Sequence, residues 1–267
     1  METLIKRFSR LFRGLDRAYG SLDLTTKDAR GKQKGKYRFV HEPRTTATYD
    51  SHLKGEVSIG VVPINEDDAC RWGAIDVDQY PLDHGEVLKS ISRIKVPLVV
   101  CRSKSGGAHL YLFLKGPVEA EKVQTALKEV AAELGFGGCE IFPKQIKLVL
   151  ERGDHGNFLN LPYFDHEGGL RYAFNQDGSA ATLEQFLDLA EASAVSEDQL
   201  GSLLSKSTPL LDDKIKDGPP CLQALLRQGF PEGTRNNGLF NLGVYLRKAY
   251  PDGWETKILE YNQSIMD

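Results

Sequence analysis

The sequence predicts an α+β fold built on a mostly antiparallel sheet, and three features indicate it. Residues 72–78 form an apolar strand pattern that carries two acids. Residues 96–114 form two apolar runs joined by a turn that contains glycine, which predicts a hairpin. Helical patterns over 84–94 and 117–134 separate the acidic strand, the hairpin and a third acidic segment. This order predicts helices packed against an antiparallel sheet.

The first twenty residues predict an amphipathic helix at the amino terminus. Apolar positions recur at helical spacing, and the basic residues lie off that stripe. The stripe consists of Leu4, Phe8, Leu11, Phe12, Leu15 and Tyr19. Because the segment has no continuous apolar core, we expect neither a signal peptide nor a membrane span. A helix lying on a membrane surface is one alternative, but we expect the stripe to dock on the main domain and no membrane to be a partner.

Charge gives the chain no general attraction for nucleic acid. Lys and Arg total 34 and Asp and Glu total 37, so the net charge is −3. Contacts with a polyanion must therefore depend on local patches. The clearest patch lies between residues 27 and 38, where Lys32, Lys34 and Lys36 are candidate contacts for template phosphate. The default expectation for this run is a solvated loop.

Two acids in the first strand predict a metal site. Asp76 and Asp78 are two residues apart, so both side chains face one side while Ile75 and Val77 enter the core. Two carboxylates at one point repel each other unless a cation lies between them. Hard oxygen ligands favour magnesium or manganese, which commonly bridge carboxylates to the phosphates of a nucleotide. The alternative is an acidic strand edge that faces water.

The hairpin turn has the chemistry of a phosphate-binding loop. Its glycines allow positive φ and close approach of the backbone to a ligand, and a cation and a hydroxyl lie beside them. The predicted nucleotide contacts in this segment are Arg102, Lys104, Ser105, Gly106, Gly107 and His109. His109 could instead be a satisfied core histidine, but its closeness to Lys104 and Ser105 favours a phosphate donor.

A third acid, Glu140, opens the segment CEIFPKQ, and an apolar run interrupted by amides follows at 156–162. Lys144 is a candidate cation for the triphosphate, and Asn157 and Asn160 are candidate nucleotide contacts. Taken alone, Glu140 is better explained as an exposed residue at the start of a strand, with a polar turn after it.

These segments, taken in order, resemble the archaeo-eukaryotic primase superfamily over roughly residues 49–165. Their sequence is most similar to the primase-polymerases of phages and mobile elements. Asp76 and Asp78 match the acidic first motif, and Glu140 matches the acid of the third. The second motif is a serine or glycine, any residue, then histidine, and Gly107-Ala-His109 fits it. The more familiar form has serine at the position of Gly107, which leaves the phosphate contacts open.

The resemblance implies an RRM-like catalytic core that acts as a DNA primase or polymerase. Asp76, Asp78 and Glu140 would then be both catalytic residues and ligands of two divalent ions, Mg²⁺ or Mn²⁺. The implied partners are a single-stranded DNA template and nucleoside triphosphates. One alternative is a catalytically silent nucleic-acid-binding module of a replication or defence complex. A two-metal nuclease is another, although it would need paired histidines and a nearby tyrosine, and HLYLF supplies only His109.

A second, helical unit is expected after a linker. We predict a catalytic domain over 1–205, a linker over 206–220 and a helical domain over 221–267, with helices at 221–228, 236–249 and 254–266. This last part resembles the helical carboxy-terminal domain of many phage and plasmid primases. Arg235 and Asn236 are its candidate nucleic-acid contacts, with helix capping as the alternative. Because such primases often precede a helicase, a helicase in the same or a separate chain is a candidate partner, and the chain could be a fragment of a longer primase.

The cysteines indicate a reducing compartment. Cys70, Cys101, Cys139 and Cys221 are far apart and form no C-x-x-C pair, so neither zinc nor a disulfide framework is expected. Each is expected to pack as a small apolar residue. We therefore expect a cytoplasmic protein, in the host cytoplasm if a phage encodes it. The motifs do not decide between ribonucleotides and deoxyribonucleotides, or between primer synthesis and extension.

Overall fold

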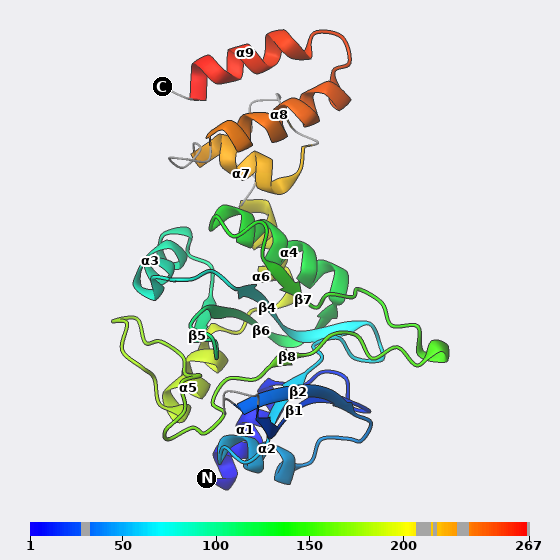
Figure 1. Ribbon diagram of the computed structural model, residues 1–267, viewed down its shortest axis with the longest axis vertical. Coiled ribbons are helices and arrows are strands. Elements are labelled where there is room, and N and C mark those ends of the chain that lie inside the picture. Colours follow the sequence, from blue (N-terminus) through cyan, green and yellow to red (C-terminus); the bar gives the residue numbers. More distant parts are fainter. Residues whose placement is uncertain (28–32, 207–214, 216–217, 229–234, 266–267) are drawn as a thin grey trace. The chain divides into compact units, whose positions relative to one another are not determined.

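The computed structural model describes residues 1–27, 33–206, 215, 218–228 and 235–265. The protein has an α+β fold with two antiparallel sheets and carboxy-terminal helices (Figure 1). The chain forms two compact units. The first contains residues 1–127 and 139–203, and the second contains residues 128–138 and 204–267.

Both sheets have four antiparallel strands. The first has the order β2 (Gln33–Val40), β1 (Tyr19–Lys27), β3 (Ser58–Val61) and β8 (Leu159–Asn160). The second has the order β5 (Leu98–Arg102), β6 (Ala108–Glu119), β4 (Ala69–Val77) and β7 (Glu140–Phe142). The predicted acidic strand is β4, and the predicted hairpin is β5 and β6.

Several helices of the first part of the chain begin at side-chain caps. The helices of this part are α1 (Glu2–Leu11), α2 (Thr46–Leu53), α3 (His84–Ile94), α4 (Ala120–Glu133), α5 (Leu183–Ser193) and α6 (Glu197–Lys206), with a short 3₁₀ helix at Leu150–Arg152. The Asp83 carboxylate accepts hydrogen bonds from the backbone N–H groups of Gly85 and Glu86 at the start of α3. Thr182 forms a capping box with Gln185 at the start of α5, as its spacing predicts.

Three sequence predictions require correction. The helix predicted from Pro117 begins at Ala120, because β6 continues to Glu119 and pairs with the start of β4. The amino-terminal stripe does not form one helix throughout, since α1 ends at Leu11 and Tyr19 opens β1. Residues 33–38 of the basic run lie in strand β2 (Gln33–Val40) rather than in a loop.

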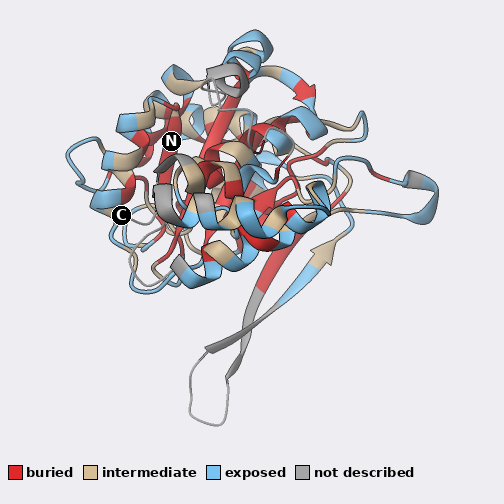
Figure 2. Ribbon diagram, turned by 90° about the horizontal axis from the view of Figure 1, so that it is seen from above, coloured by how far each residue is buried: buried red, intermediate tan, exposed pale blue. Residues whose placement is uncertain are grey.

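Alternation along β4 divides its side chains between two layers. Trp72 and Ala74 face an aromatic core together with Tyr111 of β6 and Phe142 of β7, which are in register with them or next to them. Phe12, just after α1, packs edge-on against Trp72 and Tyr111, with ring centroids 5.5 and 5.4 Å away. The predicted docking of the amino-terminal stripe is therefore confirmed. Figure 2 shows the buried residues concentrated along the interior strands.

The second unit contains α7 (Pro220–Gln228), α8 (Arg235–Ala249) and α9 (Trp254–Ile265), which confirms the three predicted carboxy-terminal helices. Its small core consists of Ile215, Leu222, Leu242 and Leu246, with Trp254 and Ile258 packed against them. Most of the predicted linker lies outside the described residues, and its last residue, Pro220, opens α7. Cys221 is exposed, which corrects the prediction that it packs in a core. No helix in the described part of the chain is long and apolar enough to cross a membrane.

Candidate active site

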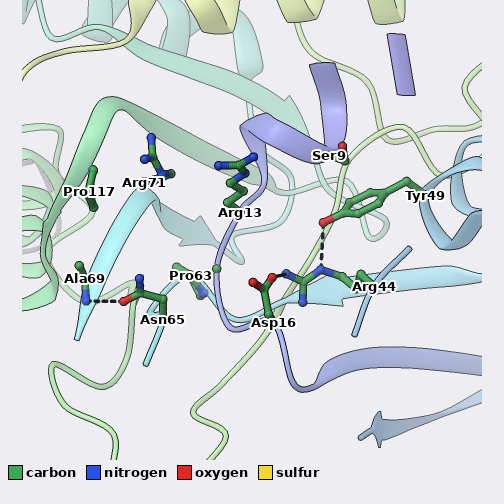
Figure 3. Close-up of a pocket in the computed structure, with 11 residues that line it drawn as sticks. Ser9, Arg13, Asp16, Arg44, Tyr49, Pro63, Asn65, Ala69, Arg71 and Pro117 are labelled. Carbon is green, nitrogen blue, oxygen red and sulfur yellow. Dashed lines mark hydrogen bonds and ion pairs between the residues drawn. The ribbon is translucent and has the colours of Figure 1, made fainter. Parts of the chain in front are cut away.

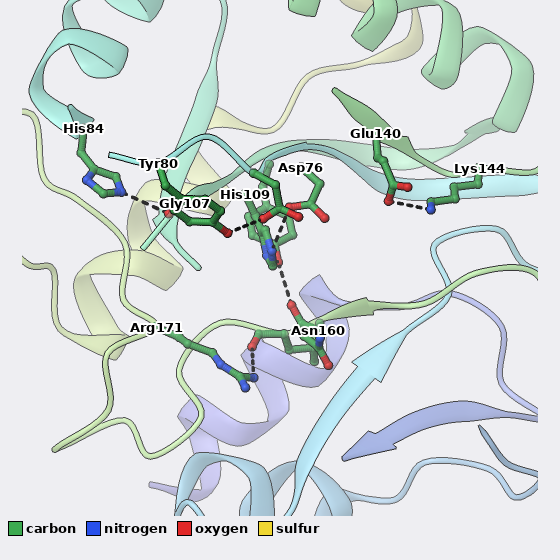
Figure 4. A network of polar contacts seen from close by, with 12 residues as sticks. Asp76, Tyr80, His84, Gly107, His109, Glu140, Lys144, Asn160 and Arg171 are labelled. Atoms are coloured by element: carbon green, nitrogen blue, oxygen red, sulfur yellow. Dashed lines mark hydrogen bonds and ion pairs between the residues drawn. The ribbon is translucent and has the colours of Figure 1, made fainter. Parts of the chain in front are cut away.

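The central strand of the second sheet, β4, brings the predicted acids and the histidine together. Asp76 lies opposite His109 of β6 on one side and opposite Glu140 of β7 on the other (Figure 4). Directly opposed residues of antiparallel strands project from the same face. The same face carries Trp72 and Ala74 further back along β4, so the site begins where the aromatic core ends.

Asp76 has the electrostatic environment of a cation ligand. Its side chain is only 16% exposed. Its Oδ1 atom is buried and accepts no hydrogen bond from the described residues. Burial and the charges of Asp78 and Glu140 raise the pKa of Asp76 to about 7. A buried carboxylate with an unpaired oxygen and two acidic neighbours fits a divalent cation, which would relieve the desolvation and the repulsion together.

The other two acids are engaged by neighbours. The Tyr80 hydroxyl donates to Oδ1 of Asp78 over 2.8 Å. Nζ of Lys144 lies 2.6 Å from Oε2 of Glu140, so the Glu140 carboxylate is turned towards Lys144 (Figure 4). Among the described residues, no group of three histidine, cysteine or acidic side chains is arranged to hold one ion. Of the three predicted acids, Asp76 and Asp78 therefore lie together, whereas Glu140 is paired with Lys144.

The glycine turn is fastened to the end of β4. The N–H of Ser103 donates to the carbonyl of Gly107 over 2.9 Å, and Gly106 has a φ of +98°. A Cβ atom on Gly107 would lie 2.2 Å from the carbonyl oxygen of Val77, so only glycine fits this approach. A ring nitrogen of His84 lies 3.1 Å from the Gly107 carbonyl. The turn is thus held one residue from Asp78.

The side chains of this turn differ in their freedom. Lys104 and Ser105 are exposed, as a ligand-binding turn requires. Arg102, at the end of β5, donates from Nη1 to the carbonyl of Leu170 over 3.2 Å. The positive end of this hairpin therefore borders the two aspartates.

His109 links the acids to the first sheet. Its Nδ1 lies 3.1 Å from the Tyr111 hydroxyl, which donates to the carbonyl of Asn160 on β8 over 3.3 Å. The other ring nitrogen, Nε2, faces Oδ1 of Asp76 at 3.4 Å. Burial and the positive charge of Arg171 lower the pKa of His109 to about 4. His109 is therefore neutral at neutral pH and lies against Asp76 rather than in the glycine turn.

The remaining predicted residues fall in different places. Asn160 lies on β8 beside the site, whereas the Asn157 amide pairs with Gln145. Lys34 and Lys36 lie in β2, and Lys32 lies outside the described residues. Arg235 and Asn236 begin α8 in the second unit, where Asn236 is exposed.

Three contributors to the site were not predicted from the sequence. Tyr80 and His84 follow the acidic strand in a loop and at a helix start, and their spacing carries no recognisable pattern. Arg171 is 93 residues from Asp78 by number, yet it is 7% exposed, and its Nη1 donates to Ser58 Oγ over 2.9 Å. Its guanidinium also lies 5.3 Å from the centre of the Phe164 ring. A buried cation of this kind leaves no signal in a local sequence pattern.

A separate hollow of about 550 Å³ lies near the start of β4, away from the acids (Figure 3). Arg13, Arg44 and Arg71 contribute to its lining. Arg44 is committed to the fold, because it donates to the Tyr49 hydroxyl over 2.9 Å and to the Leu15 carbonyl over 2.6 Å. The hollow is therefore positively lined but is not part of the acidic site.

Comparison with known families agrees with the geometry. The family described as "TOTE conflict system, Archaeo-Eukaryotic Primase domain" matches residues 23–203, which is more than half of the chain. The chain belongs to this family. Membership confirms the predicted archaeo-eukaryotic primase superfamily, and the match places this primase domain in a conflict-system group. Members of the superfamily are typically nucleotidyltransferases that use divalent metals.

Solved structures similar to this primase domain are distant. The primase-polymerase AEP domain of cyanophage S-2L matches with a TM-score of 0.39 and 12% identity, over 71% of this chain and 98% of that chain. The catalytic domain of primase RepB' in complex with initiator DNA matches with a TM-score of 0.36 and 13% identity, over 77% and 96%. Primase RepB' itself matches with a TM-score of 0.36 and 12% identity, over 99% and 94%. These TM-scores are too low to carry an argument about function, and no curated protein matches the chain.

Proposed function

We propose that this primase domain is a DNA primase or polymerase that joins nucleoside triphosphates on a single-stranded DNA template. The observation that carries the proposal is the buried, unpaired carboxylate oxygen of Asp76, beside Asp78 and Glu140, in a chain of the archaeo-eukaryotic primase family. The reaction is an in-line attack of a hydroxyl on the α-phosphate of the incoming triphosphate, with pyrophosphate leaving.

Asp76 and Asp78 are the residues that would hold divalent ions, Mg²⁺ or Mn²⁺. Such ions lower the pKa of an attacking hydroxyl and neutralise charge on the triphosphate and the leaving group. Glu140 would join the ligand set by leaving Lys144, and Lys144 would then be free to contact a phosphate. Because both side chains of that pair are partly exposed, at 61% and 30%, exchanging partners costs little.

The other side chains bind and position. Lys104, Ser105 and the backbone amides of Gly106 and Gly107 would bind the triphosphate, with Arg102 beside them. His109 would orient Asp76, because its neutral ring is fixed by Tyr111. Asn160 would contact the nucleotide from the first sheet, and Asn157 would do so only after leaving Gln145.

The helical second unit is the proposed counterpart of the carboxy-terminal domain of phage and plasmid primases. We infer that residues 1–205 carry the chemistry, that 206–220 link the two parts and that 221–267 assist initiation. Arg235 and Asn236 at the start of α8 are the proposed template contacts of that unit. A helicase in the same or a separate chain is the proposed further partner.

Primer and extension assays test the chemistry directly. The purified chain is incubated with single-stranded template, labelled nucleotides and Mg²⁺ or Mn²⁺, with and without a primer. We expect template-dependent products from the wild type, none from the Asp76→Asn/Asp78→Asn double variant, and wild-type levels from the exposed Glu167→Gln control. Products formed without a primer would establish priming. A folded wild type that binds template but makes no product under any of these conditions would refute the catalytic proposal.

One observation favours a second candidate, a catalytically silent nucleic-acid-binding module. The Glu140–Lys144 ion pair removes the third acid from Asp76 and Asp78. A calorimetric titration of Mn²⁺ with and without a nucleoside triphosphate separates the two functions. An enzyme should bind Mn²⁺ more tightly when the nucleotide is present, whereas a silent module should bind it equally with and without the nucleotide.

A further inference from the structure

One face of the first sheet carries a cluster of aromatic rings that the proposed chemistry does not use. Tyr37 and Phe39 project from edge strand β2, and Phe158 lies just before β8. The Phe158 ring is 5.9 Å from that of Tyr37 and 5.1 Å from that of Phe39 between centroids. We call these three residues the aromatic platform. Tyr37 is 47% exposed, and the other two rings are partly exposed.

Two glycines, Gly20 and Gly60, lie beneath the Phe158 ring of the platform. The strand register places Phe39, Gly20, Gly60 and Asn160 in one row across the four strands, all on one face. A Cβ atom on either Gly20 or Gly60 would lie 2.4 Å from the Phe158 ring. The ring therefore lies directly on the bare backbone of the two central strands. The opposite face of the sheet buries its apolar residues in the core.

The platform leads into the acidic site through Asn160. Its Nδ2 donates to the Tyr37 hydroxyl over 3.2 Å, and its backbone carbonyl accepts from Tyr111, the partner of His109. The side-chain Oδ1 of Asn160 is buried and accepts no hydrogen bond from the described residues. Figure 4 shows Asn160 on the side of the site that faces His109 and Asp76. An unused acceptor thus lies between the exposed rings and the reacting groups.

The residues around the aromatic platform indicate which kind of ligand it binds. Base faces stack on exposed aromatic rings whatever the base, and single-strand-binding surfaces combine such rings with positive charge along the backbone path. Strand β2 supplies the rings, and Arg38, which lies between Tyr37 and Phe39 in the sequence and faces the other side of the strand, supplies a positive charge at the same sheet edge. Arg38 is exposed. A protein partner would be met by a larger apolar surface with fewer positive charges.

We propose that the aromatic platform binds the bases of single-stranded DNA, with Tyr37 as the main stacking surface. The identity of that strand as the template rests on the proposed function. The stacking itself requires only the rings and their exposure, with Arg38 on the same strand.

Binding of a dye-labelled oligothymidylate by fluorescence anisotropy, without divalent metal, tests the proposal. We expect Tyr37→Ala to weaken binding about 5- to 150-fold, which corresponds to the roughly 1 to 3 kcal/mol lost when a stacking ring is removed. Tyr37→Phe keeps the ring and is the matched control, so it should bind nearly as the wild type does. Tyr37→Ala should keep the wild-type salt dependence because no charge is lost, whereas Arg38→Gln should reduce the salt slope. An abasic oligomer of equal length should bind wild type and Tyr37→Ala equally.

Three results would overturn the proposal. One is wild-type affinity of a folded Tyr37→Ala variant for oligothymidylate. Another is an equal loss of affinity for the abasic oligomer. The third is a raised KM for the incoming nucleotide with unchanged DNA binding, which would assign the platform to the nucleotide base. The outcome is separate from the proposed chemistry, because the assay contains no divalent metal and measures DNA binding rather than product formation.

Discussion

A buried histidine remote from the acids should make the fold sensitive to mild acid. His52 of α2 is fully buried, and both of its ring nitrogens are used by the backbone. Nδ1 accepts from the N–H of Ile59 over 3.2 Å, so Nε2 carries the proton and donates to the Pro162 carbonyl over 2.9 Å. A second proton on this ring would displace the Ile59 hydrogen bond.

The size of the effect follows from the pKa. Burial, aided by the charge of Arg171, lowers the pKa of His52 from 6.5 to about 4. Between those values the unfolded chain binds a proton that the folded chain does not, so the free energy of unfolding falls as the pH falls. The shift corresponds to about 3 kcal/mol below pH 4 and to about 2 kcal/mol between pH 7 and pH 5.

Urea denaturation of wild type and His52→Gln at several pH values measures this contribution. The variant should be less stable at pH 7 by about 1 to 3 kcal/mol, because the flexible amide does not reproduce the packing of the ring and the geometry of its hydrogen bonds to Ile59 and Pro162. From pH 7 to pH 5 it should lose about 2 kcal/mol less than the wild type loses. Other titrating groups occur in both proteins and cancel in the difference, and the exposed His41→Gln controls for the loss of a histidine. Equal losses in wild type and His52→Gln would refute the reasoning.

Two further substitutions test the site itself. Gly107→Ala should displace the glycine turn, because its Cβ atom would meet the Val77 carbonyl. Nucleotide affinity measured by calorimetry should then fall at least tenfold. Gly116 has open space around it, so the control Gly116→Ala should leave that affinity unchanged. Lys144→Gln should release the Glu140 carboxylate and tighten Mn²⁺ binding in the absence of nucleotide. The expected gain is about fivefold, because an exposed ion pair contributes little free energy. Unchanged Mn²⁺ affinity would mean that Glu140 is not a ligand.

Much of the second sheet could be predicted because its signals are local. The acids of β4 alternate with apolar residues, and the hairpin has apolar runs on both sides of a glycine turn. The pairing of Glu140 with Lys144 could not be predicted from their spacing. The two residues are four apart, but they lie on a strand and the turn after it, where such a spacing does not determine whether two side chains point towards each other. The choice depends on Phe142, over whose ring Lys144 lies at 5.2 Å.

The first sheet was harder to predict because its strands are short or carry charge. β8 has only two residues, and β2 has the composition of a solvated loop. What makes β2 a strand is long-range pairing with β1 and the contact of its two rings with Phe158, more than a hundred residues away. Such contacts belong to the assembled fold and leave no periodic trace in a window of the sequence.

The packing of Phe158 on two glycines has a consequence for how the sequences of this family evolve. Gly20 and Gly60 give up their own side chains, and one ring from a distant segment covers both positions. A relative with a larger residue at position 20 or 60 would need a smaller one at position 158, so these three positions should change together during evolution rather than independently. A set of related sequences in which they vary without regard to one another would indicate that the ring rests on a different support in those proteins.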